Sequence, residues 1–148
     1  MAETKSFRKI LYVREQEKMD AQKAYQQSTD SFEQIATRFY YLLKKKEDAE
    51  TSYEELIQHS TTLDKVKEQA AYIEKLNKQI ICLQHEVQQA RNEMESKQSQ
   101  LTNAHVEVKK FQHIIDSRNH EKMENEKQLE RNQMDAISLT QYITYKNR

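Results

Sequence analysis

The sequence predicts an all-α protein in which two long helices form an antiparallel coiled-coil hairpin, with the C-terminal helix overhanging the first. Three observations predict this fold. The chain of 148 residues contains no Gly and no Pro, which are the strongest markers of turns. Apolar residues recur at alternating steps of three and four along two long stretches, as they do in left-handed coiled coils. The pattern lapses once, near residue 60, where the chain is expected to reverse.

The first helix is expected over about residues 5–59, because one register holds along most of that stretch. The positions of this register would form the seam, the line along which paired helices meet, and most of them are apolar or aromatic. They are Phe7, Leu11, Arg14, Lys18, Ala21, Tyr25, Ser28, Phe32, Ile35, Phe39, Leu42, Lys46, Ala49, Tyr53 and Leu56. Arg14 has two interpretations at this stage: its stem passes the seam and leaves the charge in water, or the residue faces a partner.

The turn is expected at about residues 60–62. Ser60, Thr61 and Thr62 are of the types that cap helices, and Thr61 with Asp64 resembles a capping box that has Asp where Glu or Gln is usual. The alternative is one unbroken helix that pairs with a second chain in a parallel dimer. Because the break in the register and the capping residues coincide, the hairpin is favoured, as a single domain over residues 1–148.

The second helix is expected over about residues 62–145, on a second register that is again mostly apolar. Its positions are Ile73, Leu76, Ile80, Leu83, Val87, Ala90, Met94, Lys97, Leu101, Ala104, Val108, Phe111, Ile115, Arg118, Lys122, Asn125, Leu129, Asn132, Ala136, Leu139 and Ile143. A period of 3.5 residues that persists this long indicates a coiled coil and argues against a disordered polar chain.

The arms of the predicted hairpin are unequal. If the chain reverses near residue 60, everything beyond about Arg118 overshoots the first helix. At about 1.5 Å per residue, some 25 overhanging residues would span nearly 40 Å. Apolar residues nevertheless continue along the overhang, at Leu129, Met134, Ile137, Leu139 and Ile143. An exposed apolar stripe usually marks a binding surface, so the overhang predicts a protein partner.

The composition argues against several classes of function. Lys plus Arg number 24 and Asp plus Glu number 24, and this balance favours neither nucleic acid nor an anionic membrane surface as a partner. The longest apolar run, residues 39–43, is far shorter than the roughly 20 residues of a membrane-spanning helix. No secretory signal opens the chain. Because Cys82 is the lone cysteine, we expect a cytosolic protein without an internal disulfide.

Candidate catalytic and metal sites are equally weak. His113 and His120 share a helical face but are seven residues apart, whereas metal sites on helices use spacings of three or four. Cys82 and His85 are close enough to touch, yet two paired helices enclose no pocket that would exclude water from a catalytic site. Without Gly, no phosphate-binding loop is expected. We therefore expect no enzyme activity, no metal and no cofactor.

The chain resembles the FliJ family in two segments, which match the N-terminal and C-terminal motifs of family members. These segments are residues 7–25 (FRKILYVREQEKMDAQKAY) and 107–138 (EVKKFQHIIDSRNHEKMENEKQLERNQMDAIS). This family supplies the small coiled-coil component of the flagellar type III export apparatus. The matching positions are Phe7, Ile10, Leu11, Val13, Arg14 and Glu15 at the start, Val108, Lys109 and Lys110 in a basic patch, and Met134, Asp135 and Ile137 at the close. The chain departs from the family pattern at Gln112 and Ala136, where acidic residues are usual.

The resemblance implies a function. Members of this family look like the central stalk of rotary ATPases: they enter the hexameric export ATPase ring by their terminal ends, reach the cytoplasmic domain of the export gate protein with the other end, and escort export chaperones. It implies a cytoplasmic protein that associates peripherally with the flagellar base at the inner membrane and is a monomer when free. The implied ATPase-binding residues are Phe7, Leu11, Arg14, Met134, Asp135 and Ile137.

Two alternatives to this function remain open at the level of the sequence. The chain could be a homodimeric coiled-coil scaffold, in which the unpaired end pairs with another copy. It could also be the equivalent stalk of a virulence injectisome, although the end motifs favour the flagellar system.

Overall fold

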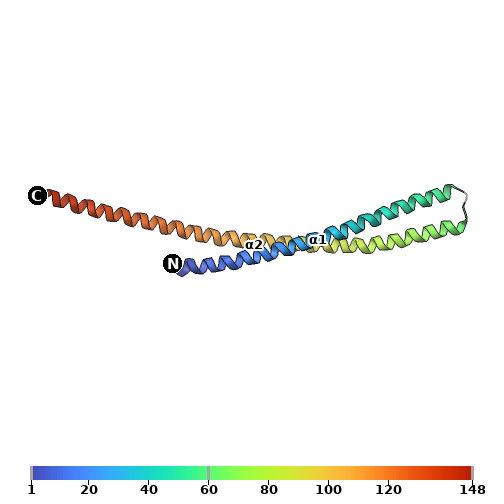
Figure 1. Cartoon of the computed structure of the whole chain (residues 1–148), viewed down its shortest axis with the longest axis horizontal. Coiled ribbons are helices and arrows are strands. Elements are labelled where there is room, and N and C mark those ends of the chain that lie inside the picture. The colour runs from blue at the N-terminus through green and yellow to red at the C-terminus, as the bar shows by residue number, and fades with distance from the viewer. Residues whose placement is uncertain (1, 60, 148) are drawn as a thin grey trace. The chain divides into compact units, whose positions relative to one another are not determined.

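The computed structural model describes residues 2–59 and 61–147, and nearly all of them are helical. Helix α1 comprises Ala2–Gln58 and helix α2 comprises Leu63–Lys146, with no strand among the described residues (Figure 1). The two helices pack against each other, so the predicted all-α helical hairpin is confirmed. Helix α1 begins three residues before the expected start, and α2 begins one residue after it.

Backbone hydrogen bonds extend each helix toward the short link between them. At the end of α1, the His59 N–H donates to the Glu55 carbonyl over 3.1 Å, and the ring Nδ1 of His59 lies 3.0 Å from the same oxygen. At the start of α2, the Thr62 carbonyl accepts from Val66 N–H at 3.4 Å. Among the described residues no side-chain hydrogen bond joins Thr61 to Asp64. Ser60, another of the predicted capping residues, lies outside the described residues.

The chain divides into two compact units: Met1–Lys18 with Ala104–Arg148, and Met19–Asn103. The expected single domain over residues 1–148 therefore stays a prediction. Both helices contribute to each unit, because α1 and α2 run in opposite directions. The first unit holds the start of α1 and the later part of α2, and the second unit holds the turn.

Within the unit Met19–Asn103, antiparallel pairing shows in three contacts between α1 and α2. In order along α1 they join Phe32 to Arg91, Arg38 to Glu86 and Ala49 to Gln69. Buried apolar side chains fill the seam between these contacts, at Ala49, Leu76, Ile80, Leu83 and Ala90. Ser28 is buried among them, and its hydroxyl donates to the Tyr25 carbonyl over 2.7 Å. That bond satisfies a polar group which would otherwise destabilise the seam.

The burial of side chains follows the predicted registers closely. Every seam position predicted from Phe7 to Leu56 is buried or half-buried, and so is every one from Ile73 to Arg118. The positions between them along the helices are mostly exposed. Seam leucines and isoleucines each contribute up to about 1.5–3 kcal/mol of burial free energy, so this stripe is the main source of stability in both units.

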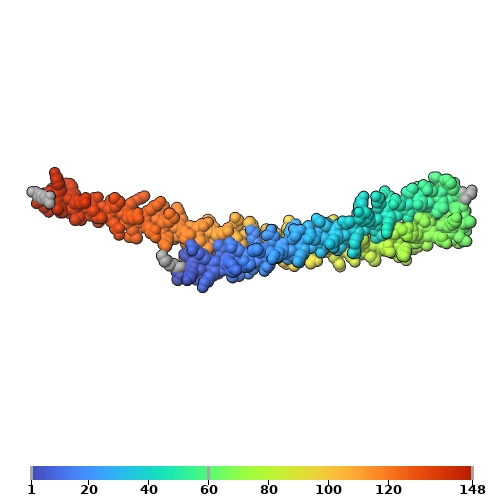
Figure 2. Space-filling model, viewed as in Figure 1, coloured from blue at the N-terminus to red at the C-terminus, as the bar shows by residue number. Residues whose placement is uncertain are grey.

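Within the first unit, α2 continues far beyond its last contact with α1. Val108 and Ile115 form the buried core of that unit. From Glu121 to Asn147 every residue is exposed. The orange and red end of α2 in Figure 2 accordingly runs on as a single helix past the blue start of α1. None of the described helices has a stretch that is both long and apolar enough to cross a membrane.

Candidate partner-binding surface

The exposed part of α2, residues 121–147, is here called the extension. It has two sections of different chemistry. Residues 121–131 carry charges of both signs at most positions, whereas residues 132–147, the tip, contain only two charged residues, Asp135 and Lys146. This contrast is large for a chain in which 32% of residues are charged. Removal of water from around the helix therefore costs less solvation free energy at the tip than in the charged section.

Large apolar side chains of the tip are well exposed and lie on all sides of the helix. Met134 is 69% exposed, Ile137 58% and Tyr145 81%. Leu139, Tyr142 and Ile143 are exposed as well. Because successive residues turn by about 100° in an α-helix, Ile137, Tyr142 and Ile143 point in three widely separated directions. A single partner helix would cover only one of these directions.

At the point where the extension begins, aromatic and charged side chains fasten the start of α1 to α2. We call Glu3, Phe7, Arg14, Phe111 and Arg118 the clasp. The rings of Phe7 and Phe111 lie 6.3 Å apart at an angle of 38°. The Arg118 guanidinium lies 4.7 Å from the centre of the Phe7 ring, and that of Arg14 lies 5.8 Å from the Phe111 ring. Two cations thus sit over two aromatic faces, which attract them electrostatically.

Carboxylates complete the clasp at both ends. Arg118 donates a hydrogen bond to Glu3, and Arg14 pairs with Glu17 at 3.0 Å. The hydrogen bond and then the charge of Arg118 hold the pKa of the Glu3 carboxyl below its ordinary value. Arg14 Nε is buried without a hydrogen-bond partner among the described residues. Arg14 therefore packs across the seam within its own chain, with its guanidinium between an aromatic ring and a carboxylate.

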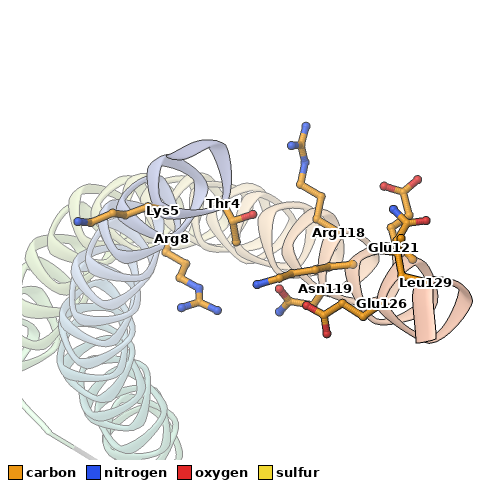
Figure 3. Close-up of a pocket in the computed structure, with 10 residues that line it drawn as sticks. Thr4, Lys5, Arg8, Arg118, Asn119, Glu121, Glu126 and Leu129 are labelled. Atoms are coloured by element: carbon orange, nitrogen blue, oxygen red, sulfur yellow. The ribbon is translucent and has the colours of Figure 1, made fainter. Parts of the chain in front are cut away.

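A groove lies beside the clasp, between the first turns of α1 and the beginning of the extension (Figure 3). Its volume is about 670 Å³. Thr4, Lys5, Arg8, Arg118, Asn119, Glu121, Lys122, Asn125, Glu126 and Leu129 line it. In Figure 3, Lys5 and Arg8 extend from α1, while Asn119, Glu126 and Leu129 come from α2. Nine of the ten lining residues are polar or charged, and the stems of their long side chains make most of the groove's surface apolar.

The six residues implied by the resemblance fall into two separate groups. Phe7, Leu11 and Arg14 are half-buried on α1, and Phe7 and Arg14 contact Phe111. Met134, Asp135 and Ile137 are exposed on the tip. Met134 is sixteen residues beyond Arg118, a distance of about 24 Å along the helix. No hydrogen bond, ion pair or ring contact joins the two groups among the described residues. One group lies in the seam of α1 and the other on the tip, so they do not form one continuous patch.

Several residues of this surface escaped the sequence analysis. Phe111 and Arg118 were placed on the seam by their register, but Glu3, Lys5 and Arg8 were not singled out. Antiparallel pairing places Glu3 opposite Arg118, and the two side chains carry opposite charges. These two features of the sequence predict the contact. Tyr142 and Tyr145 lie off the seam register, and the sequence signal for them is the low charge of the tip as a whole.

The clasp predicts a local effect of Phe111→Ala. Loss of this half-buried ring should cost about 1–2 kcal/mol and loosen the first turns of α1, because both Phe7 and Arg14 lose their aromatic neighbour. Amide hydrogen exchange of residues 3–11 should become faster, while exchange in Met19–Asn103 stays unchanged. His113→Ala, an exposed change two residues away, is the matched control. Equal exchange in both variants would contradict a role for the ring in holding α1.

The clasp also predicts a dependence on pH. A carboxylate with a lowered pKa stabilises the folded contact at pH values above its ordinary pKa, and this contribution is lost as the pH falls through the lowered value. The protection of the first turns of α1, taken relative to the intrinsic exchange rate at each pH, should therefore fall on acidification in the parent protein. The fall should be smaller in Glu3→Gln, which removes the titrating group.

The fold and the exposed tip define a class of protein: a helical hairpin in which, among the described residues, one helix continues unpaired beyond the start of the other. Comparison with known proteins gives the family. The family model described as "Flagellar FliJ protein" matches residues 4–147. A flagellar FliJ protein of Bacillus subtilis (strain 168) is 31% identical over 137 residues, which cover 93% of this chain and 93% of that protein. No solved structure matches. The chain belongs to the FliJ family, and this membership supports a role as a flagellar export component.

Proposed function

We propose that this protein is a stalk-like, non-enzymatic component of the flagellar type III export apparatus and that it binds the export ATPase ring through its extension. One observation carries the proposal. The extension is a continuous helix that no other described part of the chain covers, and large apolar side chains lie on all sides of its tip. Apolar side chains that face every direction are all buried only where the surroundings enclose the helix, and the lumen of a hexameric ring is such an enclosure.

The two sections of the extension suit different depths of the ring. The tip, with its two charges in sixteen residues, would lie where water is excluded. The charged section, residues 121–131, would remain near the mouth of the ring, where its charges stay hydrated. The groove at the clasp lies at the same level and would meet polar groups at the rim. Phe7, Leu11 and Arg14 contribute by fixing where the paired part of the hairpin ends.

Affinity would come mainly from the large side chains of the tip. Anchor residues in interfaces are often Tyr, Trp or Arg and are surrounded by contacts of smaller effect. Tyr142 and Tyr145 join an apolar ring to a hydroxyl group that keeps a hydrogen-bond partner. Met134 adds a flexible side chain that adapts to an irregular wall. Asp135 would fix the register by meeting a donor in the ring.

The rest of the protein would link the ring to the other parts of the apparatus. The turn region of Met19–Asn103 exposes Ile57 and Leu63 on either side of the link, and we assign to it the contact with the cytoplasmic domain of the export gate protein. Export chaperones would bind along the hairpin. The protein would act in the cytoplasm, held at the flagellar base by these contacts. Free of partners and in dilute solution it would be a monomer, because each helix of the hairpin covers the seam of the other.

A pull-down of the purified flagellar export ATPase with the full chain tests the proposal. The expected result is retention of the ATPase, and no retention would refute the proposed partner. The ATPase of a virulence injectisome, presented in the same way, is the control for specificity. Stronger retention of the injectisome ATPase would assign the protein to that system instead.

A further inference from the structure

The exposed extension continues the register of the hairpin seam. Counting on from Ile115 and Arg118 in steps of three and four reaches Lys122, Asn125, Leu129, Asn132, Ala136, Leu139, Ile143 and Lys146. Three of the first four positions are polar, and the apolar part of the register lies in the tip. Positions of this register are covered by α1 up to Arg118 and are bare beyond it. The tip thus carries one stripe of coiled-coil type within its all-round apolar surface, with Leu139 and Ile143 at its centre.

We propose that this stripe pairs with the same stripe of a second copy of the chain, as an antiparallel, two-fold symmetric pair of tips. The charges of the tip select this partner and this direction. When Leu139 lies opposite the partner's Ile143, Ala136 lies opposite the partner's Lys146, and Asp135 is one residue from that position. The small Ala136 leaves room for the lysine stem, so the ammonium group reaches Asp135.

The two-fold axis repeats this contact. In such an interface, if a residue of the first copy contacts a given residue of the second, the same two residues also contact each other with the copies exchanged. Asp135 and Lys146 are the only charges of the tip, and both are used in the pair. A parallel pair would instead set Asp135 beside the partner's Asp135 and Lys146 beside the partner's Lys146. Like charges at that distance are destabilising, so the antiparallel pair is favoured.

The pair should be weak and reversible. Two helices of sixteen residues cover less surface than the roughly 1,200–2,000 Å² of a stable complex. In dilute solution the chain therefore stays a monomer, and pairing appears as the concentration rises. Met134 and Ile137 point away from the stripe and take no part in the pair, whereas the ring proposed above would cover all sides of the tip. The two modes of binding can for this reason be separated by substitution, and the pair does not depend on the proposed function.

Sedimentation equilibrium of the full chain over a wide range of concentrations tests the pair. The mass should rise from the 17.8 kDa of one chain toward twice that value. Leu139→Ser with Ile143→Ser should hold the mass at that of the monomer at every concentration. Met134→Ser with Ile137→Ser, matched in number and exposure but off the stripe, should associate as the parent does. Helicity by circular dichroism should be unchanged in both. A parent that stays monomeric throughout, or equal association of the two variants, would overturn the proposal.

Charge exchange tests the direction of pairing. Asp135→Lys alone should weaken self-association about tenfold, because two pairs are lost and two repulsions are created. Lys146→Asp alone should have a similar effect. An equimolar mixture of Asp135→Lys and Lys146→Asp should associate as the parent does, because each variant supplies the charges that the other lacks. In a parallel pair each single variant would keep the like-charge contacts of the parent and lose nothing, and the mixture would associate more strongly than the parent because only the mixture would join opposite charges. A single variant that associates as the parent does, or a mixture that associates more strongly than the parent, overturns the direction proposed.

Discussion

Removal of residues 130–148 is expected to abolish binding to the flagellar export ATPase and to leave the hairpin folded. The described residues of this segment, 130–147, are all exposed and make no contact with α1, so their loss takes nothing from either core. The proposed ring contact, by contrast, loses the whole tip. The measurements are retention of the ATPase in a pull-down, and circular dichroism with thermal melting for the fold. Unaltered retention of the ATPase by the shortened chain would show that the extension is not the part that faces the ring.

Point variants refine this result. Met134→Ala with Ile137→Ala should weaken ATPase binding by about 1–4 kcal/mol, the usual range for truncated interface anchors, with no change in melting temperature. Glu124→Ala with Lys127→Ala is the matched control in the charged section, where both residues are also exposed and outside the core. It should bind nearly as the parent does, because these charges stay hydrated at the mouth of the ring. Equal losses in the two variants would argue against a tip that lies deeper than the charged section.

The sequence alone was enough to place the seam and the end of the paired region. In a two-helix coiled coil the apolar stripe is the one surface that can be buried, because side chains off the stripe have nothing to pack against. The seam positions from Phe7 to Leu56 accordingly face α2. The end of pairing near Arg118 followed from the position of the turn. The division of the chain at Lys18 and Ala104 did not follow, since the register runs through it without a break.

The polar details of the candidate site were harder to foresee. Arg14 was left with two interpretations, and the structure places its guanidinium over the Phe111 ring. This contact depends on the rotamers of long side chains and on which residue of α2 stands opposite, neither of which the spacing specifies. The Thr61–Asp64 capping box had the right residue types, yet it is the Thr62 backbone carbonyl that accepts the first bond of α2. Local motifs of this kind are decided by backbone geometry at the turn.

Leu76→Ala is expected to be the most damaging single substitution for the fold. Leu76 is 3% exposed in the seam of Met19–Asn103, and truncation of a buried leucine costs about 2–5 kcal/mol. That is a large part of the roughly 5–15 kcal/mol that stabilises most folded proteins. A two-helix coil has no second layer to close over the cavity, so the cost should lie high in that range. Thermal melting followed by circular dichroism measures it.

The matched control for Leu76→Ala is Ile81→Ala, five residues further along α2 and 57% exposed. It should melt close to the parent, because its side chain is already largely in water. Below its melting temperature, Leu76→Ala should still retain the export ATPase, since the seam near the turn and the tip belong to different units. The shortened chain should show the reverse pattern, stable but unable to bind. Equal melting of the two alanine variants would mean that the seam does not pass through Leu76.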